Sequence, residues 1–163
     1  MSSRRSAAIF RDRFTNHRET MWRDPEKRRD LGLLVVRIGL GLTFLFIHGG
    51  PKLLGGPERW ARVGGAMQVF GIDFAPTFWG LVAALSEAIG GGLLLLLGLF
   101  FPWALIFPTL TLLVAALGHL TGLIPGGPWY PLELAIVFIA LMLTGPGRYS
   151  LDARRARQQV TIS

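Results

Sequence analysis

Residues 31–56, LGLLVVRIGLGLTFLFIHGGPKLLGG, decide the class of this protein. The segment 31–49 is mostly apolar, and its length approaches the about 20 residues that a helix needs to cross a hydrocarbon core of about 30 Å. Two glycines, Pro51 and Lys52 follow it directly. This pattern predicts a membrane-spanning helix that ends near residue 49 and leaves His48 at the mouth of a bundle.

Three further apolar segments have comparable lengths: about residues 74–101, 102–122 and 130–144. Backbone inside a bilayer has to satisfy its own hydrogen bonds, so each segment is expected to be a helix. The predicted fold class is therefore an all-α membrane protein, a bundle of four transmembrane helices within residues 31–147. A basic N-terminal arm, residues 1–30, and a basic C-terminal tail, residues 148–163, flank the bundle.

The composition agrees with a membrane protein. Of the 163 residues 51% are hydrophobic, and the mean hydropathy is +0.45, which is high for a soluble domain. Nine of the 17 Lys and Arg residues precede Leu31, and four lie from Arg148 onward. Basic residues placed beside apolar segments set topology and attract anionic lipid, so the net charge of +7 favours the lipid bilayer over nucleic acid as a partner. The sequence has no cysteine, which excludes a disulfide or thiolate site within this chain.

The basic residues also predict the orientation. Four crossings place both termini on one side, and their arginines predict that this side is the cytoplasm. The connection that follows the first helix then faces outward. Within it, Pro57 suits the first turn of a helix, and Trp60, Val63, Met67 and Phe70 recur at helical spacing. We therefore expect a short amphipathic helix at the outer interface or folded back over the bundle.

The second apolar segment carries a pattern typical of close helix packing. Gly80, Ala84, Ala88 and Gly92 recur every four residues. Small residues at this spacing allow two helices to approach closely in a membrane.

Ionisable side chains within the apolar segments are the candidate functional residues, because such groups are costly in lipid and usually face the bundle interior. Arg37 on the first helix and Glu87 on the second are predicted to form a buried ion pair. His48, Lys52, His119 and Glu133 are expected near one depth at the outer end of the bundle, and Lys52 is expected to reach Glu133 or an anionic ligand.

Two interpretations of this outer cluster remain open. It forms a polar pocket for an anionic or quinone-like head group, or for proton relay, or its members satisfy one another and the broken backbone. A metal site is the weaker alternative, because the sequence contains no short ligand motif such as HExxH. No nucleotide motif is present either, so the only cofactor expected is a quinone. Trp103, Trp129 and Tyr130 are interpreted as interface anchors.

These residues resemble the DoxX family. RIGLGLTFLFIHGGPKLLGG (residues 37–56) is similar to the family's first-helix signature, and ALSEAIGGGLLLLLGL (residues 84–99) to its second helix. His119, Glu133 and GPGRYSLD (residues 145–152) resemble its third and fourth helices. The resemblance implies a small four-helix protein of the bacterial inner membrane, associated with membrane redox chemistry. It also implies that six ionisable residues are functional positions: Arg37, His48, Lys52, Glu87, His119 and Glu133.

Three functions are compatible with the sequence, and whether the chain is an enzyme is left open among them. The first is a quinone-interacting component of a membrane oxidoreductase system, with other membrane or redox subunits as partners. The second is a non-catalytic accessory or scaffold subunit of a larger membrane complex. The third is a protein that binds or transports a small molecule or lipid.

Overall fold

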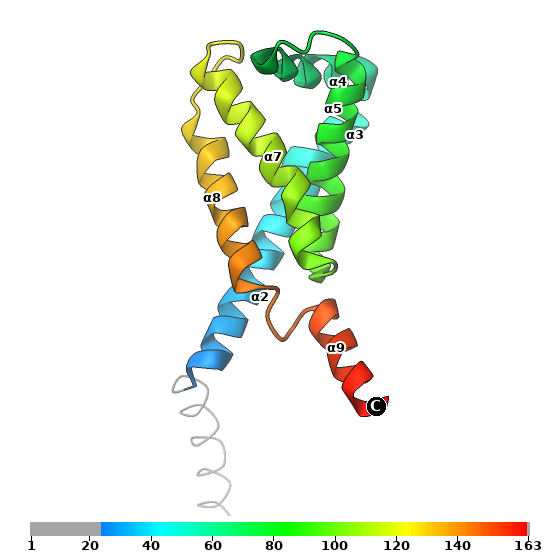
Figure 1. Ribbon diagram of the computed structural model, residues 1–163, viewed down its shortest axis with the longest axis vertical. Helices are drawn as coiled ribbons and strands as arrows, with labels where there is room; N and C mark the ends of the chain where they lie inside the picture. The colour runs from blue at the N-terminus through cyan, green and yellow to red at the C-terminus, as the bar shows by residue number, and fades with distance from the viewer. Residues whose placement is uncertain (1–23, 163) are drawn as a thin grey trace, which may run out of the picture.

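The computed structural model describes residues 24–162, and within this range every regular element is a helix (Figure 1). Three continuous helical segments are long and apolar enough to cross a membrane: Pro25–Leu54, Pro76–Leu97 and Phe101–Leu120. A fourth apolar helix, α8 (Trp129–Thr144), has 16 residues, or about 24 Å at 1.5 Å per residue. The predicted all-α class with four apolar helices is therefore confirmed. The expected N-terminal arm lies largely in residues 1–23, outside the described residues.

The first crossing consists of α2 (Pro25–Thr43), a π-helical turn η1 (Phe44–His48) and α3 (Gly49–Leu54). The helix was expected to end near residue 49, but it continues through Pro51. The wide turn η1 ends three residues before that proline, and in a regular helix the pyrrolidine ring would clash with the carbonyl one turn earlier. Lys52 therefore lies within the same continuous helical segment as the preceding residues.

Asp24 caps the start of α2. Its Oδ1 accepts hydrogen bonds from the backbone N–H of Glu26 at 3.0 Å and of Lys27 at 3.2 Å. The Lys27 N–H, as the larger cause, and that of Glu26 hold the pKa of the Asp24 carboxyl below its usual value. The cap is therefore present at neutral pH and is lost only as the pH falls through this lowered pKa.

The second crossing also contains a π-helical part: α5 (Pro76–Leu85), η3 (Ser86–Leu94) and α6 (Leu95–Leu97). Gly98 and Phe100 then adopt left-handed backbone conformations, which reverse the chain into α7 (Phe101–Leu120). Residues 121–128 connect α7 to α8. Figure 1 shows the two termini of the described chain at one end of the bundle, hereafter the terminal end; α4 and residues 121–128 lie at the other, the loop end.

The helix predicted in the first connection is present as α4 (Gly56–Gly64), followed by a 3₁₀-helix, η2 (Gly65–Phe70). It packs directly on α5. A Cβ atom on Gly64 would overlap the Pro76 carbonyl, and one on Gly80 would overlap the Trp60 carbonyl. The two glycines thus let the backbones of α4 and α5 touch.

Close contacts of the same kind hold the first two crossings together. A Cβ on Gly49 would overlap the backbone nitrogen of Ala88, and one on Gly92 would lie 3.1 Å from that of Leu45. Ala84 and Ala88 are buried. The four small residues at positions 80, 84, 88 and 92 therefore lie at helix contacts. A core of larger side chains fills the space toward α7 and α8: Phe44, Leu95, Phe101, Leu105, Leu112, Ala135, Phe138 and Leu141.

The last helix, α9 (Leu151–Ile162), is tied to the terminal end of the bundle. The Asp152 carboxylate accepts hydrogen bonds from the N–H groups of Phe100 at 3.1 Å and Phe101 at 2.9 Å, so it caps the start of α7. The N–H of Asp152 donates to the Gly98 carbonyl at 3.1 Å. The motif GPGRYSLD (residues 145–152) therefore stabilises the turn between the second and third crossings through hydrogen bonds of Asp152.

Candidate functional site

A cavity of about 600 Å³ lies at the loop end, between α3, α4 and η2 on one side and α5, η3 and α7 on the other. Most of its wall is apolar. The polar or ionisable side chains along it are Lys52, Arg62, Trp79, Ser86, Glu87, Thr111 and His119. These come from segments that lie far apart in the sequence, and the cavity exists only because the helices cross there.

The Lys52–Glu87 ion pair is the strongest polar feature of this wall. Both carboxylate oxygens of Glu87 lie 2.7 Å from the Lys52 ammonium. Glu87 is 2% exposed, at the first turn of η3, and Lys52 reaches it from α3. The Trp60 indole N–H donates to the Lys52 carbonyl at 2.9 Å, which fixes the lysine backbone against α4. A charge pair is thus held at the wall of an otherwise apolar cavity.

The structure corrects the predicted Arg37–Glu87 pair. Arg37 is 1% exposed and donates to three carbonyls: Leu95 at 3.1 Å, Leu96 at 3.0 Å and Pro146 at 2.8 Å. Two of these belong to the last turn of the second crossing, where carbonyls lack the usual partner four residues on; the Leu95 carbonyl also accepts from the Gly98 N–H at 3.1 Å. The Arg37 guanidinium, which has five N–H donors, therefore forms hydrogen bonds with the carbonyls at the negative end of this helix. Glu87 pairs with Lys52 instead.

Trp79 carries an unsatisfied donor beside the cavity. Its indole Nε1 is buried and, among the described residues, has no hydrogen-bond acceptor. A buried donor left unpaired costs about 1–3 kcal/mol, so an acceptor that reached the Trp79 N–H would stabilise the complex.

Elsewhere in the cavity wall, the hydroxyls of Ser86 and Thr111 lie 2.9 Å apart and link the second and third crossings.

His119 lies at the end of α7, where the cavity meets residues 121–128. Its Nδ1 lies 3.2 Å from the carbonyl oxygen of Ile124, which can only accept a hydrogen bond. In the neutral ring this contact assigns the proton to Nδ1 and leaves Nε2 as an acceptor. His119 therefore brings a hydrogen-bond acceptor to this wall, and Lys52 brings a donor.

The predicted outer cluster divides into three places. Lys52 and His119 line the same cavity. His48 lies outside that wall, where its Nε2 is 2.7 Å from the Tyr130 hydroxyl of α8. Tyr130, interpreted from the sequence as an interface anchor, thus also links the first and fourth crossings.

Glu133 differs most from its expected place. It is exposed and, within residues 24–162, makes no hydrogen bond or ion pair, so the expected approach of Lys52 to Glu133 is corrected. The buried residues of α8 are Pro131, Ala135, Phe138 and Leu141. At 100° per residue Glu133 lies on the opposite face of that helix.

Sequence reasoning missed Trp79, Ser86 and Thr111. A signal existed for the first two, because Trp79 and Ser86 are seven residues apart in one helix and therefore share a face with Val82. Thr111 gave no such signal. Among residues 24–162, no group of three or more His, Asp or Glu side chains lies close enough to hold a metal ion.

Comparisons with known proteins agree with this architecture. The DoxX family model matches residues 32–120, which is more than half of the chain. The inner membrane protein YphA of Escherichia coli (strain K12) is 33% identical over 138 residues, and the match covers 77% of this chain and 91% of that protein. No solved structure matches the chain. The chain therefore belongs to the DoxX family of membrane proteins.

Proposed function

We propose that this DoxX protein binds the head group of a membrane quinone in the Lys52–Glu87 cavity, as the quinone-interacting component of an inner-membrane oxidoreductase system. The observation that carries the proposal is an apolar cavity of about 600 Å³ whose wall contains the Lys52–Glu87 pair and Trp79, a residue whose buried indole N–H has no acceptor among residues 24–162. A quinone is an apolar ring with two carbonyl acceptors, so it matches a site with apolar walls and few polar groups.

The polar groups suit both redox forms of such a ring. The Trp79 indole and the Lys52 ammonium are donors for a quinone carbonyl. The His119 Nε2 is an acceptor for the hydroxyl of a quinol, since its Nδ1 faces the Ile124 carbonyl. Apolar side chains such as Val82, Phe107 and Leu110 supply the surface against which the ring and the first part of its tail pack.

The test is a binding titration of the purified protein with a short-chain ubiquinone. Trp79→Phe keeps an aromatic ring but removes the N–H, and we expect it to weaken binding about 3- to 10-fold, as loss of one hydrogen bond of about 1 kcal/mol would. His119→Phe should weaken quinol binding more than quinone binding. The matched control is Tyr130→Phe, because Tyr130 lies outside the cavity. Unchanged affinity in both cavity variants would overturn the proposal.

A second candidate function, an accessory subunit of a larger membrane complex, is favoured by Glu133. This carboxylate lies on the outward face of α8, among exposed apolar residues such as Trp129 and Ile136. Charged groups are costly on a lipid-facing surface, and a polar group of a neighbouring chain would lower that cost. Glu133→Gln should then reduce the amount of partner that co-purifies, as measured by mass spectrometry of natively isolated protein. If no partner co-purifies with the unaltered chain, this candidate is wrong.

A further inference from the structure

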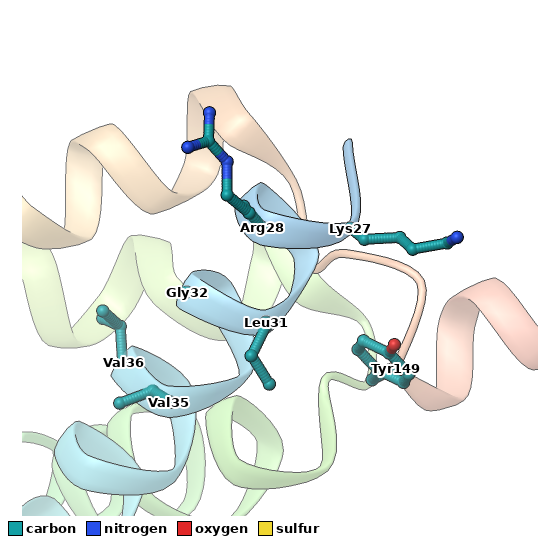
Figure 2. Close-up of a pocket in the computed structure, with 7 residues that line it drawn as sticks. All are labelled: Lys27, Arg28, Leu31, Gly32, Val35, Val36 and Tyr149. Atoms are coloured by element: carbon teal, nitrogen blue, oxygen red, sulfur yellow. The ribbon is translucent and has the colours of Figure 1, made fainter. Parts of the chain in front are cut away.

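A second hollow lies at the opposite end of the molecule, on the outer side of α2. It encloses about 480 Å³ and is formed by the first turns of α2 together with Tyr149, which follows α8 (Figure 2). Figure 2 shows Lys27 and Arg28 in the first turn, Leu31 and Gly32 in the next, and two valines, Val35 and Val36, one turn further along. The groove therefore has cations at one end and an apolar floor at the other.

The depth of the groove matches the boundary of a bilayer. The chain is charged up to Asp30, and the apolar run of the first crossing begins at Leu31. Lys27 and Arg28 consequently lie at the level of lipid head groups, while Val35 and Val36 lie at the level of acyl chains. Val35 is 63% exposed, and Leu31 is 40% exposed.

Gly32 creates the hollow between these side chains. A Cβ atom placed on it would meet nothing within 4 Å. Because position 32 lies one turn beyond Arg28 and one turn before Val36, its missing side chain opens a channel along the helix face. An extended hydrocarbon chain fits such a channel, whereas a full row of side chains would close it.

The Tyr149 wall is held in place by contacts on both sides. The N–H of Arg148 donates to the carboxylate of Asp30 at 3.2 Å, and Asp30 is buried. The Arg148 guanidinium lies 5.7 Å from the centroid of the Tyr149 ring, a cation–π distance. These contacts fix Tyr149 beside α2 and add a third cation near the groove.

The acidic groups at this end leave the cations available. Asp24 lies 3.2 Å from the Lys27 ammonium, but the lysine side chain is 44% exposed, and exposed ion pairs are weak because water screens them. Arg28 is exposed. Among residues 24–162, an incoming phosphate therefore competes with one weak ion-pair partner of these two cations.

We propose that this groove binds one anionic phospholipid, with its phosphate held by Lys27 and the Tyr149 hydroxyl, which lie on the same side of α2 (Figure 2), and one acyl chain lying over Gly32 between Leu31 and the valines; Arg28, on the other side of the helix, adds positive charge at the same depth. Charge complementarity selects an anionic head group, and the continuity of the cations with an apolar channel selects a lipid over a soluble anion. The site is independent of the quinone cavity, which lies at the loop end.

The test uses the full chain in nanodiscs of equal parts phosphatidylglycerol and phosphatidylcholine, with native mass spectrometry of the lipid retained after release. We expect one phosphatidylglycerol to remain bound in preference to phosphatidylcholine. The double variant Lys27→Gln/Arg28→Gln should lower this preference at least about tenfold, since each basic residue near an anionic lipid surface contributes about 1 kcal/mol. Gly32→Leu should lower retention while leaving every charge in place.

The matched control, Arg154→Gln/Arg155→Gln, removes two charges from α9 at the same end and should retain the lipid. Equal loss in the control and in the groove variant would show only diffuse attraction to a basic end and would overturn the proposal. So would unchanged retention in Gly32→Leu. If residues 1–23 or a second copy of the chain fill the groove instead, the unaltered protein will show no preference for phosphatidylglycerol, which also overturns it. Because position 32 faces open space, the leucine variant is expected to fold, and its thermal midpoint checks this.

Discussion

Individual side chains decide how this bundle tolerates charge. Glu87 is almost fully buried, and Lys52 places its ammonium against both carboxylate oxygens. Arg37 is equally buried, but its partners are carbonyls at a helix end. Each charge thus has hydrogen-bond partners, and removing the partner of a buried charge leaves that charge in an apolar setting.

Lys52→Met is expected to destabilise the protein by about 3–5 kcal/mol, because it leaves the Glu87 carboxylate buried and unpaired. The double variant Lys52→Met/Glu87→Gln should recover most of this loss, since neither position then carries a charge. Unfolding of each protein in detergent measures the effect. If the effects of the two single substitutions add in the double variant, the pair is not energetically coupled.

Tyr130→Phe tests the link between the first and fourth crossings. It removes the hydroxyl that lies 2.7 Å from His48 Nε2, and a loss of about 0.5–1.5 kcal/mol is expected from one hydrogen bond. Trp129→Phe is the control, because Trp129 is more exposed, at 68%. Equal unfolding midpoints for Tyr130→Phe and the unaltered chain would contradict the link.

At the scale of elements, close backbone approach joins the helices. The second crossing contacts α4 through Gly80 and the first crossing through Gly92. The aromatic side chains Phe44 and Phe138, with ring centroids 4.9 Å apart, bridge the wider gap between the first crossing and α8. Small residues thus allow close contacts between some helices, and aromatic rings span the wider separations between others. This is expected in a membrane, where the hydrophobic effect does not drive helices together and packing contacts do.

Two glycines of the first crossing are expected to respond oppositely to alanine. Gly49→Ala would place a methyl group in overlap with the Ala88 backbone nitrogen, so the helices must separate, at a cost of about 1–3 kcal/mol or more. Gly39→Ala meets nothing within 4 Å and should be neutral or stabilising by up to about 1 kcal/mol. Thermal unfolding of the two variants compares them. Similar midpoints would show that the approach at Gly49 is not tight.

At the scale of the whole molecule, the two candidate sites lie at opposite ends. The Lys52–Glu87 cavity lies among α3, α4, η2 and α7 at the loop end, and the groove proposed for lipid lies at the start of α2. The basic residues of the first turns and of α9 gather at the terminal end (Figure 1). Positive charge beside apolar segments is retained on the cytoplasmic side.

This charge distribution predicts that both termini are cytoplasmic, and cysteine labelling tests it, because the chain has no native cysteine to interfere. Glu58→Cys in α4 should react with a membrane-impermeant maleimide applied from outside spheroplasts. Gln158→Cys in α9 should react only after the membrane is opened. The reverse pattern would place the terminal end outside and contradict the prediction.

Much of this architecture could be predicted from the sequence because the bilayer imposes strong rules. Runs of apolar residues near 20 in length predict spanning helices, and the spacing of Trp60, Val63 and Met67 predicted the helix of the first connection. The helix phase was harder to predict. Arg37, His48 and Lys52 share a face at 100° per residue, but the π-helical turn η1 lies between Arg37 and Lys52 and rotates α3 relative to α2.

The sequence by itself determined the membrane class, the four apolar segments, the family resemblance and the small set of ionisable residues within the segments, since these depend on composition and spacing along one chain. Only the tertiary structure decided the partners: Glu87 with Lys52, Arg37 with a helix end, His48 with Tyr130, and Trp79 with none among the described residues. Partner choice depends on how each helix is rotated about its axis and how closely its neighbour approaches. Both are set by contacts between residues that lie far apart in the sequence.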